Sequence, residues 1–385
     1  HGLSCPTMGR RFSPGTDSVR CVDAAGAPDA GLRLRARPVA VAAPARRRGL
    51  HAAGAALLAA AAPGLANAQA AFVDDAGRRV PIGASVRRVF PAGAPASVFL
   101  YCLAPDRLLG WTRALRADEA AFLLPEVAAL PELGRLTGRG STAALESVLA
   151  MRAELIVDVG AVAATHSSLA HQGPRQTGVP YLLLDGAFER TESTLRRLGS
   201  ALGLTARAES LARGTRAILD AAAELRAGLA EGDRPRVLFA RGPTGLVTSA
   251  GLNAEVLDQV GAINVARVDA PNLALVSLEQ VSAWRPDWIL ASDPSFVAQL
   301  DRHPVWSRLP AVRARRVLLI PRVPFGWFDA PPALNRLIGI EWLSAVFHPR
   351  RVHDRLDERL AATFEWLYHR RPSIGQMRAL LATTR

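Results

Sequence analysis

One short phrase occurs twice in this chain. Residues 145–157 read LESVLAMRAELIV, and residues 278–290 read LEQVSAWRPDWIL. Both begin with Leu-Glu, keep Val, Ala and Arg at matching positions, and pass through an acidic residue into an apolar run. This pattern predicts a helix followed by a buried strand. The same unit in two distant places indicates two α/β lobes built on one plan.

The surrounding segments repeat in the same order. Strands are predicted at 88–90, 108–112, 155–160 and 180–185, with helices at 94–103 and 142–151 and a helical stretch ending near 176. A second series has strands at 236–240, 288–291 and 315–321, with helices at 253–260 and 277–284. Such alternation is typical of parallel sheets covered on both faces.

The segment between the two series is the most regular part of the chain. Apolar or small side chains recur from Ala208 to Leu229 at alternating steps of three and four, which predicts a helix over 205–230 with one buried stripe. Gly203 separates it from a helix over 191–202. The predicted fold class is therefore α/β: two Rossmann-like lobes with parallel sheets, joined by one long helix, with a ligand cleft between them. Such a stiff connection predicts only a small closure on ligand binding.

The predicted organisation has four parts. Residues 1–70 are an upstream extension and export signal peptide, 71–188 the first lobe, 189–232 the interlobe helices, and 233–385 the second lobe with terminal helices. Within the first part, a basic start and an apolar stretch precede small residues, so we expect cleavage near Ala68 or Ala70. The apolar stretch over 49–62 is too short for a stable membrane anchor, and we expect no membrane insertion of the mature chain.

Charge and cysteine content narrow the setting. The formal net charge is +13, no Lys is present, and the remainder of the chain shows no block of like charge, so we expect no nucleic-acid partner. Cys102 is the one Cys after the predicted cleavage site, and it lies in an apolar run. It is expected to be a buried core thiol.

The chain after residue 70 resembles the periplasmic substrate-binding proteins of iron-siderophore, haem and cobalamin ABC importers that have one interlobe helix. The stretches that carry this resemblance are 88–112, 138–160 and 177–186 in the first lobe, and 251–266, 278–293 and 325–343 in the second. The last stretch, FGWFDAPPALNRLIGIEWL, also resembles molybdate and tungstate binders of the same fold. The resemblance implies a periplasmic protein that captures an iron chelate and delivers it to a permease and its ATPase. The alternatives are oxyanion binding and an exported α/β enzyme.

Ligands of open parallel sheets bind beyond the carboxyl ends of the strands, so the loops there hold the candidate contacts. In the first lobe these are Arg139, Gly140, Ser141 and Thr142, where glycine, hydroxyls and a helix N-terminus suit an anion. His166 follows the strand over 155–160 and could contact a metal or an oxyanion, or be structural.

In the second lobe, Arg241 follows the opening strand and could face Arg139 across the cleft, which suits a ligand with carboxylate or oxyanion groups. Substituting either Arg by Ala is predicted to weaken anion binding and to leave the melting temperature unchanged. Trp327 and Asp329 lie in an aromatic and proline-rich loop after the last strand. Trp327 could stack on a bulky chelate or fill the base of the lobe, and Asp329 could contact ligand or cap the helix expected near 331.

No enzyme motif supports catalysis. The chain has no P-loop Lys, no dinucleotide Gly fingerprint after a strand, no His-Glu-x-x-His and no Gly-x-Ser-x-Gly. We expect no catalytic residue, no cofactor and no metal bound directly by the chain. The mature protein is expected to be a monomer. Relatives of this kind dock on their permease through one acidic residue per lobe, for which Glu132 and Asp258 are the candidates.

Overall fold

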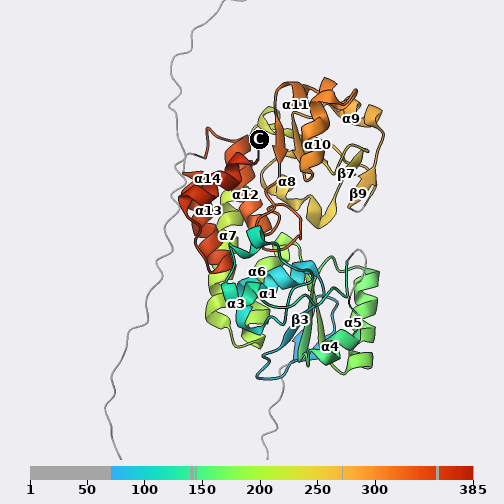
Figure 1. The fold of residues 1–385 in the computed structure, drawn as a ribbon, viewed down its shortest axis with the longest axis vertical. Helices are drawn as coiled ribbons and strands as arrows, with labels where there is room; N and C mark the ends of the chain where they lie inside the picture. Colours follow the sequence, from blue (N-terminus) through green and yellow to red (C-terminus); the bar gives the residue numbers. More distant parts are fainter. Residues whose placement is uncertain (1–70, 139–142, 144, 271, 353–354, 385) are drawn as a thin grey trace, which may run out of the picture. The chain divides into compact units, whose positions relative to one another are not determined.

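Two sheets carry the fold, and each has parallel strands at its centre. The computed structural model describes residues 71–138, 143, 145–270, 272–352 and 355–384. In the first sheet the order is β3 (Val89–Pro91), β4 (Leu155–Gly160) and β5 (Tyr181–Asp185), all parallel. β4 is buried along its whole length because helices cover both faces of the sheet (Figure 1). Leu155 and Val157 face a core shared with α1 (Ala94–Leu103), whereas Ile156 faces a second core with α4 (Leu145–Ala150) and α5 (Ala164–Thr177).

The second sheet extends the same plan. Its order is β11 (Val317–Leu319), β10 (Trp288–Ala291), β6 (Arg236–Ala240), β7 (Leu246–Thr248) and β9 (Leu273–Leu275), and β8 (Ile263–Asn264) also pairs with β6. Pairing is parallel between β11 and β10, between β10 and β6, and between β6 and β8. β7 runs antiparallel to both of its neighbours, β6 and β9. The parallel strands were predicted, except the two-residue β8. The antiparallel pair was not predicted, because three-residue strands leave little periodicity.

The repeated phrase of the sequence forms the same unit in both lobes. Residues 145–157 give α4 and β4, and residues 278–290 give α9 (Leu278–Trp284) and β10. β4 lies beside β3 with Leu155 opposite Val89, and β10 lies beside β6 with Trp288 opposite Val237. In both units an Arg turns the chain from helix to strand in the left-handed region, at φ 48° and 46°. Strand pairing therefore confirms the predicted two-lobe plan.

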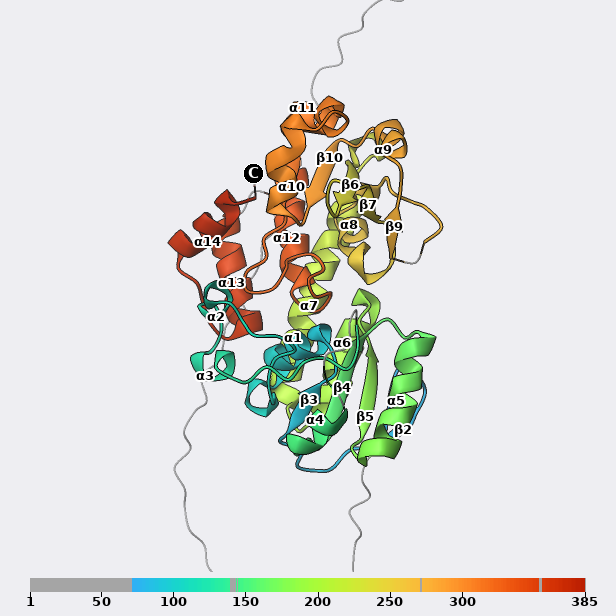
Figure 2. The same ribbon diagram turned by 45° about the vertical axis from the view of Figure 1, so that its right-hand side comes forward.

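The connecting helices agree closely with prediction. α6 (Phe188–Ala201) packs against α7 (Thr205–Ala227), and Gly199 permits this because a Cβ there would lie 2.1 Å from the Ala208 side chain. α7 begins at the predicted residue and ends three residues early; at 1.5 Å per residue its 23 residues span about 34 Å. Its stripe from Ala208 to Leu225 is buried, apart from the half-buried Ile218. α7 contacts α6, α8 (Glu255–Gln259) and α12 (Arg336–Phe347), and so runs between elements of both lobes (Figure 2).

The terminal helices pack partly on the first lobe. α13 (Leu356–Tyr368) and α14 (Ile374–Ala382) follow α12, and α13 contacts both α12 and α1. The Tyr101 hydroxyl of α1 donates to the Tyr368 carbonyl at 2.7 Å, and Arg207 of α7 donates to the Trp366 carbonyl at 2.7 Å. One hydrophobic cluster joins these helices to both lobes, and all described residues lie within one compact unit.

The remaining elements are short. β1 (Ala71–Val73) and β2 (Arg79–Pro81) form an antiparallel pair, and α2 (Ala117–Ala120), α3 (Pro125–Ala128), α10 (Pro294–Gln299) and α11 (Pro310–Arg313) are brief helices. The strand predicted over 108–112 is wrong: Leu108 and Trp111 make only isolated parallel bridges, to Val89 and Glu132. Cys102 is buried, with a pKa raised to about 12 by burial.

Candidate ligand-binding cleft

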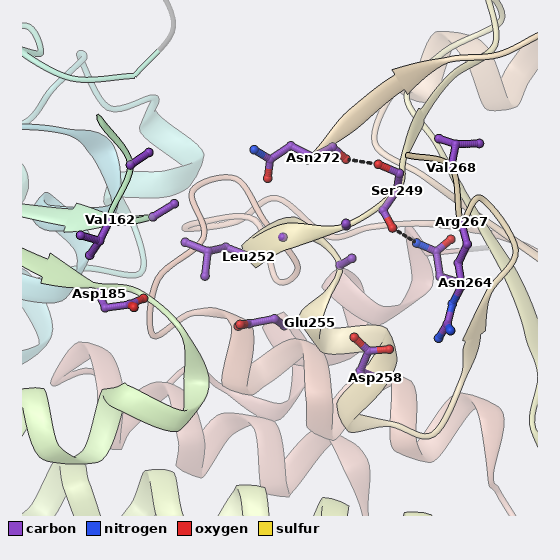
Figure 3. Close-up of a pocket in the computed structure, with 15 residues that line it drawn as sticks. Val162, Asp185, Ser249, Leu252, Glu255, Asp258, Asn264, Arg267, Val268 and Asn272 are labelled. Atoms are coloured by element: carbon purple, nitrogen blue, oxygen red, sulfur yellow. Dashed lines mark hydrogen bonds between the residues drawn. The ribbon is translucent and has the colours of Figure 1, made fainter. Parts of the chain in front are cut away.

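A cavity of about 720 Å³ lies between loops of the two lobes (Figure 3). The first lobe contributes the turn after β4 and the end of β5, and the second lobe contributes the segments after β7 and β8. The residues that line it are Ala161–Ala163, Asp185, Ser249–Leu252, Ala254, Glu255, Asp258, Asn264, Arg267, Val268 and Asn272. The volume lies within the range of roughly 300–1,000 Å³ typical of small-molecule sites.

The charged groups of the cavity are mostly acidic. Asp185, Glu255 and Asp258 contribute carboxylates, against one guanidinium from Arg267. Figure 3 shows Glu255 between Asp185 and Asp258 along the lower wall, with Arg267 on the side of the second lobe. Partial desolvation beside the cavity raises the pKa of Asp258, which is still exposed at the surface, while the positive charge of Arg267 opposes that increase. Such a lining favours a ligand with hydrogen-bond donors over a bare dianion, because like charges repel at short range.

The neutral polar groups stabilise the wall itself. Asn264 Nδ2 donates to the carbonyls of Thr248 and Ser249 at 3.1 and 2.9 Å, and its Oδ1 accepts from the Ala266 amide at 3.1 Å. The Ser249 hydroxyl donates to the Ala270 carbonyl at 2.9 Å. These buried groups have their partners within the protein, so they hold the loops in place. The lining residues that the structure describes include no aromatic side chain.

The predicted anion loop of the first lobe, Arg139, Gly140, Ser141 and Thr142, lies outside the described residues, and its role stays a prediction. The residues that precede it are well anchored. The Thr137 hydroxyl donates to Asp158 Oδ1 at 3.0 Å, and the Tyr181 hydroxyl donates to Oδ2 at 3.0 Å. Burial raises the pKa of Asp158. A Cβ on Gly93 would lie 2.6 Å from the Thr137 hydroxyl, so glycine permits this close approach.

His166 lies in the first turn of α5 rather than in a loop. Its Nδ1 is 2.9 Å from the carbonyl oxygen of Ala161, a residue that lines the cavity. His166 itself is not among the lining residues. The imidazole therefore supports the turn after β4, and direct contact with a ligand stays a prediction.

Arg241 and Asp329 form an ion pair in the second lobe. The side chains are 16% and 4% exposed, and the Arg241 Nε also donates to the Thr248 hydroxyl at 2.8 Å. The guanidinium lies 4.0 Å from the centre of the Phe239 ring. Burial raises the pKa of Asp329, and Arg241 opposes this rise. Neither residue lines the cavity, and Asp329 does not cap a helix, because α12 begins at Arg336 after Asn335.

Trp327 is a core residue, which the sequence left as the competing possibility. It is fully buried, its indole N–H donates to the Val323 carbonyl at 3.0 Å, and its ring packs against Trp342 and Phe364. The predicted stacking of Trp327 on a chelate is incompatible with this position, because its ring is fully buried against Trp342 and Phe364. The proline-rich loop turns its aromatic side chains inward rather than toward the cleft.

The two docking candidates differ in position. Glu132 is exposed, and its carboxylate accepts a hydrogen bond from the Ala114 amide at 3.1 Å. Asp258, also exposed, lines the cavity. A change at Asp258 would therefore alter the ligand cavity as well as any docking surface.

Sequence reasoning missed most of the cavity. Asp185 ends a predicted strand, so the strand-end rule that selected Arg241 could have found it. Arg267 and Asn272 lie between β8 and β9, in a part of the second lobe with no counterpart in the first. No simple pattern marks them.

Two properties of the described residues bear on function. No helix among them is both long and apolar enough to cross a membrane. Within the same ranges, no group of three or more His, Cys, Asp or Glu side chains could hold a metal ion.

The sequence matches a family model described as periplasmic binding protein over residues 134–324, which includes β4 to β11 and all the residues that line the cavity. Residues 134–324 belong to the periplasmic binding protein family. The two-lobe periplasmic binding protein fold extends beyond them to the whole described chain. An ABC transporter solute binding protein from Sulfurospirillum deleyianum superposes with a TM-score of 0.74, 22% identity, and coverage of 82% of this chain and 99% of that one.

Two further similar proteins are named for different ligands. The molybdate-binding protein MolA of Haemophilus influenzae is 31% identical over 124 residues, which is 31% of this chain. That match spans about a third of the curated relative's length, at 35%. A periplasmic haem-binding protein from Pseudomonas aeruginosa is 25% identical with a TM-score of 0.53, over 69% of this chain and 93% of that one.

Proposed function

We propose that this protein is the periplasmic solute-binding component of an ABC importer, and that it captures an iron chelate such as a siderophore complex or haem, or a cobalamin-like ligand. The observation that carries the proposal is the cavity of about 720 Å³ lined by both lobes. Sequence and fold similarity to periplasmic solute-binding proteins supports the general role. The protein binds and releases its ligand without changing it, and delivers it to a permease and its ATPase.

Cavity size and charge favour a chelate over an oxyanion. A tetrahedral oxyanion has five atoms and would leave most of this volume to water, whereas a chelate could displace that water and contact both lobes. Asp185 and Asp258 would also repel a dianion. A chelate can instead offer amide, hydroxyl or ammonium donors to these carboxylates. The absence of aromatic residues from the described lining favours a chelate held by polar contacts over a flat stacked one.

A second candidate is a molybdate or tungstate binder of the same fold. The sequence match to MolA favours it, and the loop over 139–142 has the glycine, hydroxyl and Arg groups that suit an oxyanion. In that case the oxyanion would occupy the first-lobe loop, and the acidic part of the cavity would stay outside the site.

Calorimetric titration with a defined panel separates the two candidates. The panel is a ferric trihydroxamate, haem, cobalamin, molybdate and tungstate, each added to protein first unfolded and refolded to remove bound solutes. We expect at least one of the chelates to bind saturably with one-to-one stoichiometry, and neither oxyanion to bind. Binding of molybdate or tungstate alone would establish the second candidate instead. Conversion of any chelate to product would support an exported enzyme.

Export and docking form part of the same proposal. We infer cleavage of the leader near Ala68 or Ala70, release of a monomer into the periplasm, and docking through acidic residues that include Glu132. Its exposed carboxylate is available to Arg side chains of a permease.

A further inference from the structure

Arg336 connects the two lobes and bonds to two residues that line the cavity. It is the first residue of α12, and it is 1% exposed. One guanidinium nitrogen donates to the Leu252 carbonyl at 2.9 Å and to the Glu255 carboxylate at 2.6 Å. Another donates to the carbonyl of Gly186, which follows β5 in the first lobe. Arg336 therefore joins α12 to the start of α8 in the second lobe, and it also bonds to Gly186 in the first lobe.

The first lobe completes this contact with Phe188. The Arg336 guanidinium lies 4.1 Å from the centre of the Phe188 ring, and the Phe188 amide donates to the Glu255 carboxylate at 3.3 Å. The backbones are also close, because a Cβ on Gly186 would lie 3.1 Å from a methyl carbon of Leu252. We call Gly186, Phe188, Leu252, Glu255 and Arg336 the interlobe joint.

The interlobe joint is rigid for a physical reason. Burial lowers the pKa of Arg336, and the Glu255 carboxylate opposes that shift. Separating the lobes would remove the Gly186 carbonyl from one guanidinium nitrogen of Arg336 and leave that charged donor without its acceptor, which is costly in a protein interior. The planar, five-donor guanidinium can serve several acceptors at fixed angles, whereas a Lys ammonium cannot reproduce this geometry.

The joint also forms part of the cavity. Leu252 and Glu255 belong both to the joint and to the cavity lining, and Asp185 of the lining precedes Gly186. We propose that Arg336 is a positioning residue of the ligand site: it fixes the distance between the two cavity walls and orients the Glu255 carboxylate toward the ligand. The ligand-binding part of this inference rests on the proposed function, whereas the lobe spacing does not.

Distance measurement between spin labels tests the spacing. Labels are placed at Gln172 on α5 and Ala314 after α11, two exposed positions in different lobes, in the full chain with Cys5 and Cys21 changed to Ser. We expect one narrow distance distribution for the otherwise unchanged protein, and a broader or longer one for Arg336→Met. Arg336→Lys should lie between them.

A matched control is Arg107→Met. Arg107 is also buried and donates to the Leu202 carbonyl at 2.6 Å, but it lies away from the joint. It should keep the narrow distribution. A distribution for Arg336→Met that overlays the unchanged protein would overturn the inference. If Arg336→Met does not fold, the distance distribution of Arg336→Lys is the test. A distribution for Arg336→Lys as narrow as that of the unchanged protein would also overturn the inference.

Titration with a ferric trihydroxamate tests the effect on the site. We expect Arg336→Met to raise the Kd at least tenfold and Arg107→Met to change it less than twofold. Equal effects of the two substitutions would show that Arg336 acts only through general stability, and would overturn its positioning role. If the unchanged protein does not bind this probe, that chelate class fails as the ligand, while the distance distributions still decide the joint.

Discussion

The buried Arg241–Asp329 pair yields the most informative stability prediction. Arg241→Met keeps most of the side-chain volume but leaves the Asp329 carboxylate, which is 4% exposed, without its guanidinium partner. Breaking a buried pair from one side costs about 3–5 kcal/mol, because an uncompensated charge remains in the interior. The loss of the hydrogen bond to Thr248 and of the contact with Phe239 acts in the same direction. Contrary to the sequence-based expectation, the melting temperature of this variant should fall.

A double-mutant cycle isolates the pair. Asp329→Leu alone leaves the Arg241 guanidinium without its carboxylate, whereas Arg241→Met with Asp329→Leu removes both members of the pair together. The double variant should therefore be more stable than the sum of the single effects implies, by roughly 1–3 kcal/mol. Urea unfolding followed by tryptophan fluorescence measures all four proteins. Additivity within about 0.5 kcal/mol, the usual behaviour of independent sites, would refute the coupling.

Four further predictions follow from other parts of the molecule. Burial raises the pKa of Glu341 to about 7 in the folded protein, so the carboxyl group ionises in the unfolded chain at a lower pH than in the folded one. The free energy of unfolding should therefore fall as the pH rises from about 4.5 to 7. Urea unfolding at several pH values measures this fall, and Glu341→Gln should make it smaller. Gly339→Ala should destabilise by at least about 2 kcal/mol, as overpacking does, because its Cβ would lie 1.9 Å from the Trp327 carbonyl oxygen. Gly375→Ala, in an uncrowded helix position, should instead stabilise by about 0.5–1 kcal/mol, and urea unfolding measures both glycine variants. Glu132→Arg should leave ligand affinity unchanged and reduce uptake in cells, and normal uptake would remove Glu132 from the docking surface.

The elements of the fold were predictable where local signals were strong. α1 begins and ends at the predicted residues, because Gly93 and Pro95 mark its start and an apolar run continues it. β4 was predicted over its full length from a six-residue, mostly apolar stretch that contains Asp158. The repeated phrase correctly predicted two lobes, because the strand of each copy lies parallel to the opening strand of its own lobe: β4 beside β3, and β10 beside β6.

The site was harder to predict because it depends on contacts between distant segments. Arg336 and Gly186 are separated by 150 residues, and no local spacing indicates that their backbone and side chain meet. Trp327 was placed at the cleft because an aromatic loop after a strand resembles a binding loop, but the sequence does not reveal which way the ring turns. Arg241 was correctly placed after its strand, yet its charge is neutralised by Asp329, a partner 88 residues away.

Native mass spectrometry of the protein purified from its own periplasm tests the central claim most directly. The full-length sequence has a mass of 41.0 kDa, and the cleaved chain should be lighter by the leader. We expect one non-covalently bound metal chelate per chain, seen as a single added mass that is lost on collisional activation. A single added molybdate or tungstate mass, or a chain that never carries a solute while it converts an added chelate, would contradict the account.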